Sequence, residues 1–375
     1  MFFSILLPTK NGNDYIDSAI KSVLDQDFKD YELIIGDNCN DYNFRMRLSR
    51  FTRDKRIKII RPSFPLNVTQ NWNYSLSKAK GRYIIMLGDD DCILKDGLKK
   101  IYKNLVSLDF PDCLSVNGIS FFHKGSFKDK HKAYYKKNYF NYSFVEPKNK
   151  FLLNRDFKNK IVEEIFSFNN LLPLNMQPHI VSRQTVLRMK KNFFLEPFPD
   201  HYAIHSLLLS NVNWWVCNEK IFGIGISKKS FGNLFYSERY LQSFKYLGLN
   251  LDETEIIRGS ILYNAQYIWL KKLKNNFPKK LFNININYKN YLMRQLIFNF
   301  IYYIKKRAIK KFLIIFFSLK FKDFLNLFKS LFDKRLFTLF LKKILINLFK
   351  YNVPIMINSN DNIYSFTRKY QNKLE

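Results

Sequence analysis

Three consecutive aspartates directly follow an apolar segment, and this junction constrains the fold more than any other part of the sequence. Residues 83–87 have the length and composition of a buried β-strand, and Gly88 ends the strand before Asp89, Asp90 and Asp91. Adjacent carboxylates repel one another unless a cation compensates them. Because open α/β sheets bind ligands at the carboxyl ends of their strands, the junction predicts a divalent metal and an anionic substrate. A solvated acidic turn before a helix is the alternative, and this stretch alone does not choose between the two.

Predicted strands and helices alternate through the first 117 residues. Further apolar runs predict strands at 3–7, 31–35, 57–60 and 113–117, and helical patterns lie between them at about 14–24, 41–51, 68–79 and 96–106. This alternation indicates βαβ units, and hence a Rossmann-like α/β fold with a mainly parallel sheet and helices on both faces. Residues 118–175 indicate little about structure; within them the segment 121–142 lacks strong periodicity, and we expect loops or an insertion there.

Loops rich in Asp and Asn follow three of the predicted strands, at 9–14, 36–41 and 88–91. In a right-handed α/β sheet these loops lie at one edge, so their polar side chains are expected to converge. The sequence has no GxGxxG after the first strand and no GxxxxGK[ST] motif, which disfavours a dinucleotide dehydrogenase and a P-loop enzyme.

The segments 8–11, 34–40 and 81–91 resemble, in order and spacing, the motifs of family 2 glycosyltransferases, which have the GT-A fold. The resemblance covers about the first 110 residues and continues more weakly over 175–235. It implies a nucleotide-sugar-binding half at 1–117 and an acceptor-side half at 118–235. The remaining residues, 236–375, are expected to form a helical C-terminal region.

The resemblance also implies roles for single residues of the donor site. Pro8, Thr9 and Asn11 would line the pocket for the base and ribose, Asp37 would contact the uracil or ribose, and Asn67, Arg82 and Asp89 are assigned to substrate binding. Asp90 and Asp91 would hold Mg²⁺ or Mn²⁺. The chain departs from the family at Asp37-Asn-Cys-Asn, where Asp-Asp-Gly-Ser is usual, and at Gly88, which takes the first position of Asp-x-Asp-Asp. The second departure moves the expected metal ligand to Asp90.

On the acceptor side, the resemblance implies that Asp200 is the general base. An inverting transfer needs a carboxylate to take the proton of the acceptor hydroxyl. Without the resemblance, a helix-capping role for Asp200 is favoured, and the two roles are compatible. His179, His205 and Ser230 are assigned to substrate binding, with packed histidines and an ordinary surface loop as the alternatives. His201 and His205 share a helix face but lack the HExxH pattern, so no zinc site is expected.

The net charge of +31 is concentrated in the C-terminal part of the chain. Residues 1–110 carry 18 Lys and Arg against 14 Asp and Glu, whereas residues 271–350 carry 20 against 2. From about residue 294, Phe, Leu and Ile alternate with Lys and Arg, which predicts basic amphipathic helices on an anionic membrane surface. A helical bundle packed on the catalytic domain is the alternative. Nucleic-acid binding is not expected, because no helix-turn-helix, zinc or RNP signature is present.

Several features indicate the compartment. No apolar run approaches the ~20 residues of a transmembrane helix, and the first ten residues lack the basic region and apolar length of a signal peptide. Cys39, Cys92, Cys113 and Cys217 are widely spaced without a CxxC pair, which indicates reduced thiols. We expect a cytoplasmic protein, peripheral on the inner face of the cell membrane.

The predicted function is a metal-dependent, inverting transfer of a sugar from a nucleotide-diphospho-sugar, a UDP-sugar above others, to a lipid-linked or surface polysaccharide acceptor. A nucleotidyltransferase is the first alternative, but it would show a glycine-rich loop with Lys or Arg after the first strand, and residues 8–13 match that poorly. A non-catalytic protein that binds membranes or nucleic acid through a GT-A-like fold is the second.

Overall fold

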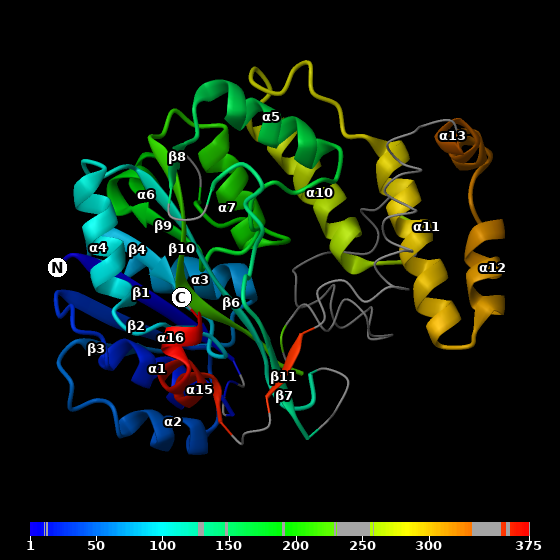
Figure 1. Ribbon diagram of the computed structural model, residues 1–375. Helices are drawn as coiled ribbons and strands as arrows, with labels where there is room; N and C mark the ends of the chain where they lie inside the picture. Colours follow the sequence, from blue (N-terminus) through cyan, green and yellow to red (C-terminus); the bar gives the residue numbers. More distant parts are fainter. Residues whose placement is uncertain are drawn as a thin grey trace.

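A computed structural model describes residues 1–10, 12, 14–126, 131–146, 149–189, 192–228, 230, 256–257, 259–331, 354–357 and 361–374. One large sheet with helices on both faces occupies the N-terminal part of the molecule, and a group of helices lies to one side of it (Figure 1). All four cysteines are free thiols, as the sequence predicted.

The first half of the sheet is parallel, as predicted. Strands β1 (Phe3–Thr9), β2 (Tyr31–Asp37), β3 (Ile57–Ile60) and β4 (Tyr83–Met86) run in the order β4-β1-β2-β3. The helices α1 (Ile16–Leu24), α2 (Tyr42–Ser49), α3 (Val68–Ser77) and α4 (Gly97–Ser107) connect or follow these strands.

Alternate side chains of β1 explain why helices cover both faces. Phe3, Ile5 and Leu7 are fully buried in the cluster that contains α1 and α4, whereas Leu6 is buried in the cluster on the opposite face, against which α3 packs. Because successive side chains of a strand point to opposite faces, a strand buried on both sides has a continuous apolar sequence.

The second half of the sheet is mixed. Next to β4 lies the antiparallel β9 (His179–Ser182), followed by β6 (Cys113–Phe122), β7 (Ala133–Lys136) and β11 (Ile355–Ile357). The long β10 (Trp214–Ile226) runs parallel to β6 and pairs antiparallel with β5 (Cys92–Ile93) and β8 (Lys150–Leu152). Since β9 is antiparallel to both β4 and β6, the carboxyl ends of β6 and β10 lie at the same edge as those of β1 to β4.

The expectation of loops or an insertion over 121–142 is wrong for part of that segment, because β6 continues to Phe122 and β7 lies within it. In the rest of the stretch to residue 175, for which no element was predicted, β8 and α5 (Arg155–Phe166) follow. The strands β7 and β8 have only four and three residues, too few to show periodicity. Their Tyr, Phe and Lys residues suit a half-buried sheet border.

A helical group follows the sheet. Helix α6 (Arg183–Arg188) and α7 (Pro199–Leu208) belong to the sheet domain, and α10 (Ile261–Asn276) packs on α7 with the buried Trp269. Beyond it lie α11 (Tyr288–Lys305), α12 (Ile309–Phe317) and α13 (Phe321–Leu331), with α12 and α13 farthest from the sheet (Figure 1). Within the described ranges, no helix is both long and apolar enough to cross a bilayer.

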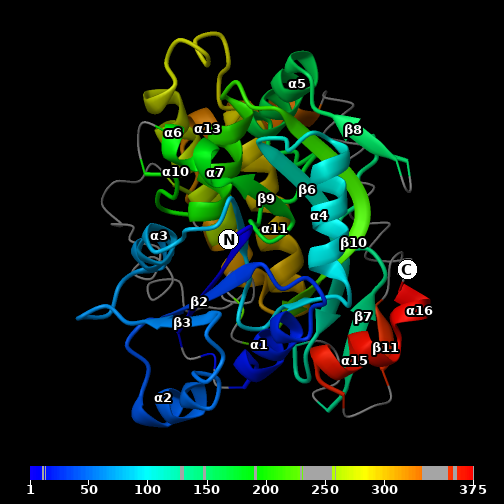
Figure 2. The same ribbon diagram turned by 90° about the vertical axis from the view of Figure 1, so that its left-hand side faces the viewer.

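The last described residues return to the sheet rather than extend the helical group. Strand β11 pairs with β7, α15 (Ile363–Lys369) lies beside α1, and α16 (Gln371–Leu374) packs on α15 (Figure 2). Arg368 pairs with Asp25 at 2.6 Å, and the Thr367 hydroxyl lies 3.7 Å from the Cys92 thiol, directly after the aspartate triplet. The region predicted at 236–375 is therefore not one uniform helical unit, because its last residues complete the N-terminal fold.

Candidate active site

Thr9 connects two of the three predicted loops at the carboxyl edge of the sheet. Its hydroxyl donates to Asp89 Oδ2 at 2.6 Å, and its carbonyl oxygen accepts from the Asn38 N–H at 3.1 Å and the Asn40 side-chain amide at 3.3 Å. A Cβ on Gly12 would lie 2.2 Å from Asp89 Oδ2, so a side chain at this position would displace the carboxylate. The loops after β1, β2 and β4 therefore form one connected group, as their position in the sequence predicted.

Asp90 is partly exposed and is contacted by residues that follow β6 and β10. The Ser230 hydroxyl donates to Asp90 Oδ2 at 2.6 Å, and His123 Nε2 donates to the Asp90 carbonyl oxygen at 3.0 Å. A Cβ on Gly225 would lie 1.8 Å from that same carbonyl oxygen, so a strand with any other residue here could not run so close to the loop. Ser230, predicted as a substrate-binding residue, thus lies within the acidic site.

Asp91 is placed differently from Asp90. It is 1% exposed, and its two oxygens accept backbone N–H groups of Gly88 at 2.8 Å and Gly225 at 2.7 Å. Burial, with the neighbouring Asp90 carboxylate, raises the pKa of Asp91 to about 8. The prediction that Asp91 is a metal ligand does not agree with this arrangement, because its oxygens tie the strand end of β4 to β10 instead of facing the edge of the sheet.

Asp37 is also held by the protein. The Asn40 backbone N–H and side-chain amide donate to Asp37 Oδ1 at 2.9 and 2.7 Å, and Arg61 pairs with Oδ2 at 2.6 Å. Arg61 also donates to the Asn40 carbonyl oxygen at 3.0 Å, which closes the loop after β2. With Asp37 only 1% exposed, its arrangement shows a residue that shapes the loop. A contact of Asp37 with a base or ribose stays a prediction.

Asp200 opens α7 on the other side of the site. Its Oδ1 accepts the backbone N–H of His201 at 2.9 Å, so the carboxylate also satisfies an N–H group of the first helical turn. The residue is partly exposed, but burial of the carboxyl raises the pKa of Asp200 to about 7. Burial, and after it the carboxylates of Asp91 and Asp200, raise the pKa of Tyr139, so this phenol lies in the field of both acids.

The two histidines predicted to bind substrate lie in the core. His179 is fully buried, accepts from the Ser115 hydroxyl at 2.7 Å and donates to the Pro173 carbonyl oxygen at 3.1 Å. His205 is 1% exposed and donates to the His201 carbonyl oxygen at 2.6 Å. Burial lowers the pKa of both histidines to about 4, so they are neutral at pH 7. The structure does not bring either side chain to the acidic edge.

The remaining predicted residues are divided between the two edges of the sheet. Pro8 lies in β1 beside Gly36, and Asn67 caps α3 with a capping box and donates to Glu196 Oε1 at 2.8 Å. Arg82 precedes β4, at the opposite end of the strand from the aspartates, and its guanidinium lies 3.9 Å from the centre of the Phe110 ring. The prediction for Arg82 is thus not supported, because it stabilises the amino edge. Asn11 lies outside the described residues.

Three residues of the site were not found from the sequence. Arg61 follows β3 and holds Asp37, His123 follows β6 and holds the Asp90 backbone, and Tyr15 lies with its ring centre 4.3 Å from that of His123. Arg61 and His123 each come directly after a strand that ends at the acidic edge, and this rule could have found them. Tyr15 carries no such signal.

The aspartate pair fits a divalent ion that is shared with phosphate. No group of three or more His, Cys, Asp or Glu side chains in the described part of the chain is placed to hold an ion. Mg²⁺ often takes only one or two carboxylates and fills its shell with phosphate oxygens and water. Asp89 and Asp90 are adjacent, partly exposed and each held at one oxygen by a hydroxyl, which suits this mode.

Comparison with known proteins agrees with this geometry. Residues 4–168 match the model of the glycosyl transferase family 2 domain. The putative teichuronic acid biosynthesis glycosyltransferase TuaG of Bacillus subtilis is 35% identical over 98 residues, which cover 26% of this chain and 39% of that protein. The GalNAc(5)-diNAcBac-PP-undecaprenol beta-1,3-glucosyltransferase of Campylobacter jejuni is 31% identical over 26% of this chain and 32% of its own length.

A third relative and one solved structure complete the comparison. The UDP-Glc:alpha-D-GlcNAc-diphosphoundecaprenol beta-1,3-glucosyltransferase WfgD of Escherichia coli is 29% identical over 31% of this chain and 47% of that protein. The chain thus spans less than half the length of these three relatives. S. aureus TarS 1–349 in complex with UDP-GlcNAc superposes with a TM-score of 0.47 at 15% identity, over 84% of this chain and 90% of that one. Residues 4–168 thus match a family 2 glycosyltransferase domain, and the parallel β4-β1-β2-β3 sheet with its acidic edge lies within that segment.

Proposed function

We propose that this chain transfers a sugar from a nucleotide-diphospho-sugar to a hydroxyl group of a lipid-linked or polysaccharide acceptor, with inversion at the anomeric carbon. The observation that carries the proposal is the cluster of Asp89, Asp90 and Thr9 at the carboxyl edge of a family 2 domain. Residues 1–117 would supply the nucleotide-sugar site and residues 118–235 the acceptor side, which includes Asp200.

Donor binding and proton transfer from the acceptor fall to different residues of the site. The loop closed by Asp37, Asn40 and Arg61 would bind the base and ribose, while Asp89 and Asp90 would hold Mg²⁺ or Mn²⁺. A divalent ion at this place supplies Lewis-acid stabilisation of the departing nucleoside diphosphate. Asp200 would take the proton from the acceptor hydroxyl as that oxygen attacks the anomeric carbon, and it then carries the proton while the nucleoside diphosphate leaves.

The names of the relatives support the choice of substrates. WfgD is named for a UDP-Glc donor and a diphosphoundecaprenol-linked acceptor, and the Campylobacter relative for an undecaprenol-linked acceptor. We therefore propose a UDP-sugar donor and a lipid-linked saccharide acceptor. A thermal-shift screen of UDP-, GDP- and dTDP-sugars, with and without Mn²⁺, tests this directly. A shift with UDP-sugars that requires Mn²⁺ is expected, and the absence of any metal-dependent shift would contradict the proposal.

The pH dependence of transfer should report the proposed base. The raised pKa of Asp200, about 7, means that the carboxyl is protonated and inactive as a base at lower pH. We expect kcat/KM to rise with pH, about tenfold per unit, and to level off above about 7. Initial rates between pH 5.5 and 9 check this, with donor binding measured in parallel as a control. A rate that falls over the same range would show that the limiting group must be protonated.

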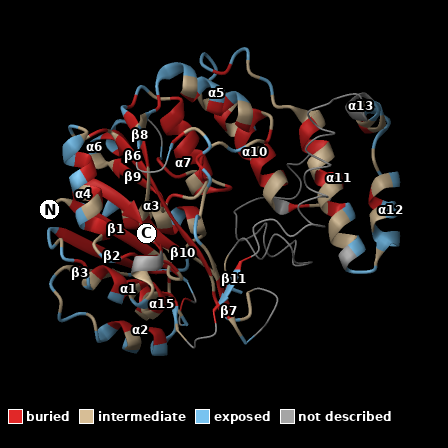
Figure 3. Ribbon diagram, in the orientation of Figure 1, coloured by how far each residue is buried: buried red, intermediate tan, exposed pale blue. Residues whose placement is uncertain are grey.

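A basic, apolar surface on α12 and α13 supports membrane association. Both helices have large apolar side chains that are exposed, among them Ile314 at 66%, Phe317 at 74% and Phe321 at 78%. Figure 3 shows that much of α12 is exposed. Lys310 and Lys311 are exposed on the same segment. Apolar and cationic side chains together favour the headgroup region of an anionic bilayer. We propose that these helices bind the inner face of the cell membrane, where a lipid-linked acceptor is presented.

Replacing Phe317 and Phe321 together with glutamine should release the protein from vesicles. Each exposed phenyl ring that enters the bilayer stabilises the membrane-bound state, because its apolar surface is removed from water. Loss of both rings should therefore weaken binding to vesicles about tenfold or more. Co-sedimentation with vesicles of phosphatidylglycerol and phosphatidylcholine at low salt measures this. Phe282→Gln is the matched control, since Phe282 is 81% exposed but lies outside these helices. Equal binding by the double variant and the control would contradict the membrane role of α12 and α13.

A further inference from the structure

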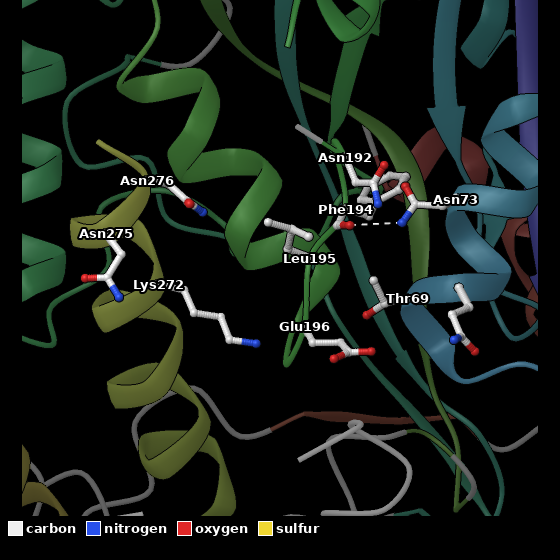
Figure 4. Close-up of a pocket in the computed structure, with 10 residues that line it drawn as sticks. Thr69, Asn73, Asn192, Phe194, Leu195, Glu196, Lys272, Asn275 and Asn276 are labelled. Carbon is white, nitrogen blue, oxygen red and sulfur yellow. Dashed lines mark hydrogen bonds between the residues drawn. The ribbon is translucent and has the colours of Figure 1, made fainter. Parts of the chain in front are cut away.

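We propose that a polar cavity between α3, the 192–196 segment and α10 binds a neutral saccharide, and that this saccharide is the part of the acceptor next to the sugar being extended. The cavity has a volume of about 390 Å³, and Figure 4 shows side chains from the three segments around it. Its identification as an acceptor site rests on the proposed function, whereas the binding of a saccharide does not.

The place of the cavity suits an acceptor. Its lining residue Glu196 precedes the proposed base Asp200 by four residues and accepts a hydrogen bond from Asn67, the N-cap of α3, at 2.8 Å. On its other side the cavity reaches α10, the helix that leads toward α12 and α13. It therefore joins the segment just before the proposed base to the first helix of the helical group, and it is built partly from residues beyond the 4–168 segment that matches the family.

Carboxamides dominate the polar part of the lining. Asn73 comes from α3, Asn192 from the loop, and Asn275 and Asn276 from the end of α10. An amide offers two N–H donors and a carbonyl acceptor, which complements sugar hydroxyls that both donate and accept. Asn192 and Asn275 are exposed, so the cavity opens to solvent. Leu195 adds an apolar contact, as is usual in sites that orient a small ligand by a few polar groups.

Thr69 provides independent support for a ligand site in the cavity. The residue is 5% exposed, and its hydroxyl oxygen has no hydrogen-bond partner in the part of the chain that is described. Thr69 lines the cavity, and Figure 4 shows its hydroxyl directed toward the side where Glu196 lies. A buried hydroxyl without a partner is costly, and a ligand hydroxyl in the cavity would satisfy it.

The charges of the lining indicate a neutral ligand. Lys272 from α10 and Glu196 from the 192–196 segment are the two ionisable residues of the lining; Lys272 extends toward that segment, and the Glu196 carboxylate is directed toward α3 (Figure 4). One positive and one negative charge leave no net attraction for a phosphate or a carboxylate. Charged side chains beside several amides instead offer strong hydrogen bonds to neutral hydroxyls.

Saccharide binding can be measured without knowledge of the natural acceptor. The probes are cellobiose, lactose and chitobiose, tested on the full chain by saturation-transfer NMR up to about 50 mM, which covers millimolar Kd values. We expect at least one disaccharide to bind, and Thr69→Val and Lys272→Met each to weaken that binding about three- to tenfold. Lys271→Met, the neighbouring exposed lysine that does not line the cavity, should leave it unchanged.

Further measurements separate this inference from the proposed function. Excess UDP should not displace the disaccharide, and Asn275→Ala, an exposed position that tolerates substitution, serves if Thr69→Val does not fold. The inference is overturned if none of the three probes binds, if the cavity variants bind as the wild type does, or if UDP displaces the probe. Loss of the disaccharide site beside intact UDP-sugar hydrolysis refutes only the inference. A saccharide site in a protein that binds no nucleotide-sugar supports the saccharide site, but it refutes the proposed function and, with it, the acceptor role of the cavity.

Discussion

Replacing Asp90 with asparagine is expected to lower sugar transfer by about 10³-fold or more. Asparagine keeps the size of the side chain and an oxygen that can accept from the Ser230 hydroxyl, but it removes the charge that would hold the divalent ion. The affinity for a UDP-sugar in Mn²⁺ should fall together with turnover, because the ion would be shared with the diphosphate. Turnover assays and calorimetry with and without Mn²⁺ measure both effects.

Asp96→Asn is the matched control for this variant. Asp96 lies six residues further along, its side chain makes no capping hydrogen bond, and its φ of 57° is one that asparagine tolerates. Its transfer rate should stay near that of the wild type. Near-normal transfer by the Asp90 variant would show that the acidic loop does not act through a bound ion.

Replacing Asp200 with asparagine should abolish transfer by a different route. General-base catalysis contributes about 10²- to 10⁴-fold, and this factor is lost when the carboxylate becomes an amide. The asparagine Oδ1 can still accept the His201 N–H, so the start of α7 should be preserved. We therefore expect a large fall in kcat with an unchanged Kd for the UDP-sugar, and the loss of the pH-dependent rise near 7.

The control for the second variant is Asp156→Asn, an exposed acid in the first turn of α5 that lies at a comparable helix position. It should behave as the wild type in kcat and Kd. An Asp200 variant that retains its kcat would place the base elsewhere. If the Kd for the donor rose as much as kcat fell, Asp200 would be a residue of the donor site.

The parallel half of the fold and its acidic edge could be predicted from two rules: strands buried on both faces have apolar sequences, and the loops after parallel strands meet at one edge. Strands such as β1 and β4 are buried on both faces, so their apolar runs mark them directly, and Gly88 marks where β4 ends. The polar loops after them meet because parallel strands place their carboxyl ends together. Asp89, Asp90 and Thr9 lie together for this reason.

The other residues could not be assigned in this way, because their environment depends on contacts between distant segments. Asp91 follows Asp90 directly, yet β10, more than 130 residues later, supplies the Gly225 N–H that holds it in the interior. His179 resembles a ligand in the sequence, but β9 runs antiparallel between β4 and β6 and places it in the core. No spacing within the sequence reports such a pairing.

The attachment of β11 and α15 to the sheet changes what a deletion would test. Because Arg368 and Thr367 contact Asp25 and Cys92, the final residues act as a brace for the strand that follows the aspartates. The helices at 261–331 are therefore an insertion between two strands of the sheet, β10 before them and β11 after them. Cutting the chain near residue 289 would remove the brace together with the helices, so lost activity would not reveal which of the two was needed. Excision of α12 and α13 alone, with the brace retained, would separate membrane binding from catalysis.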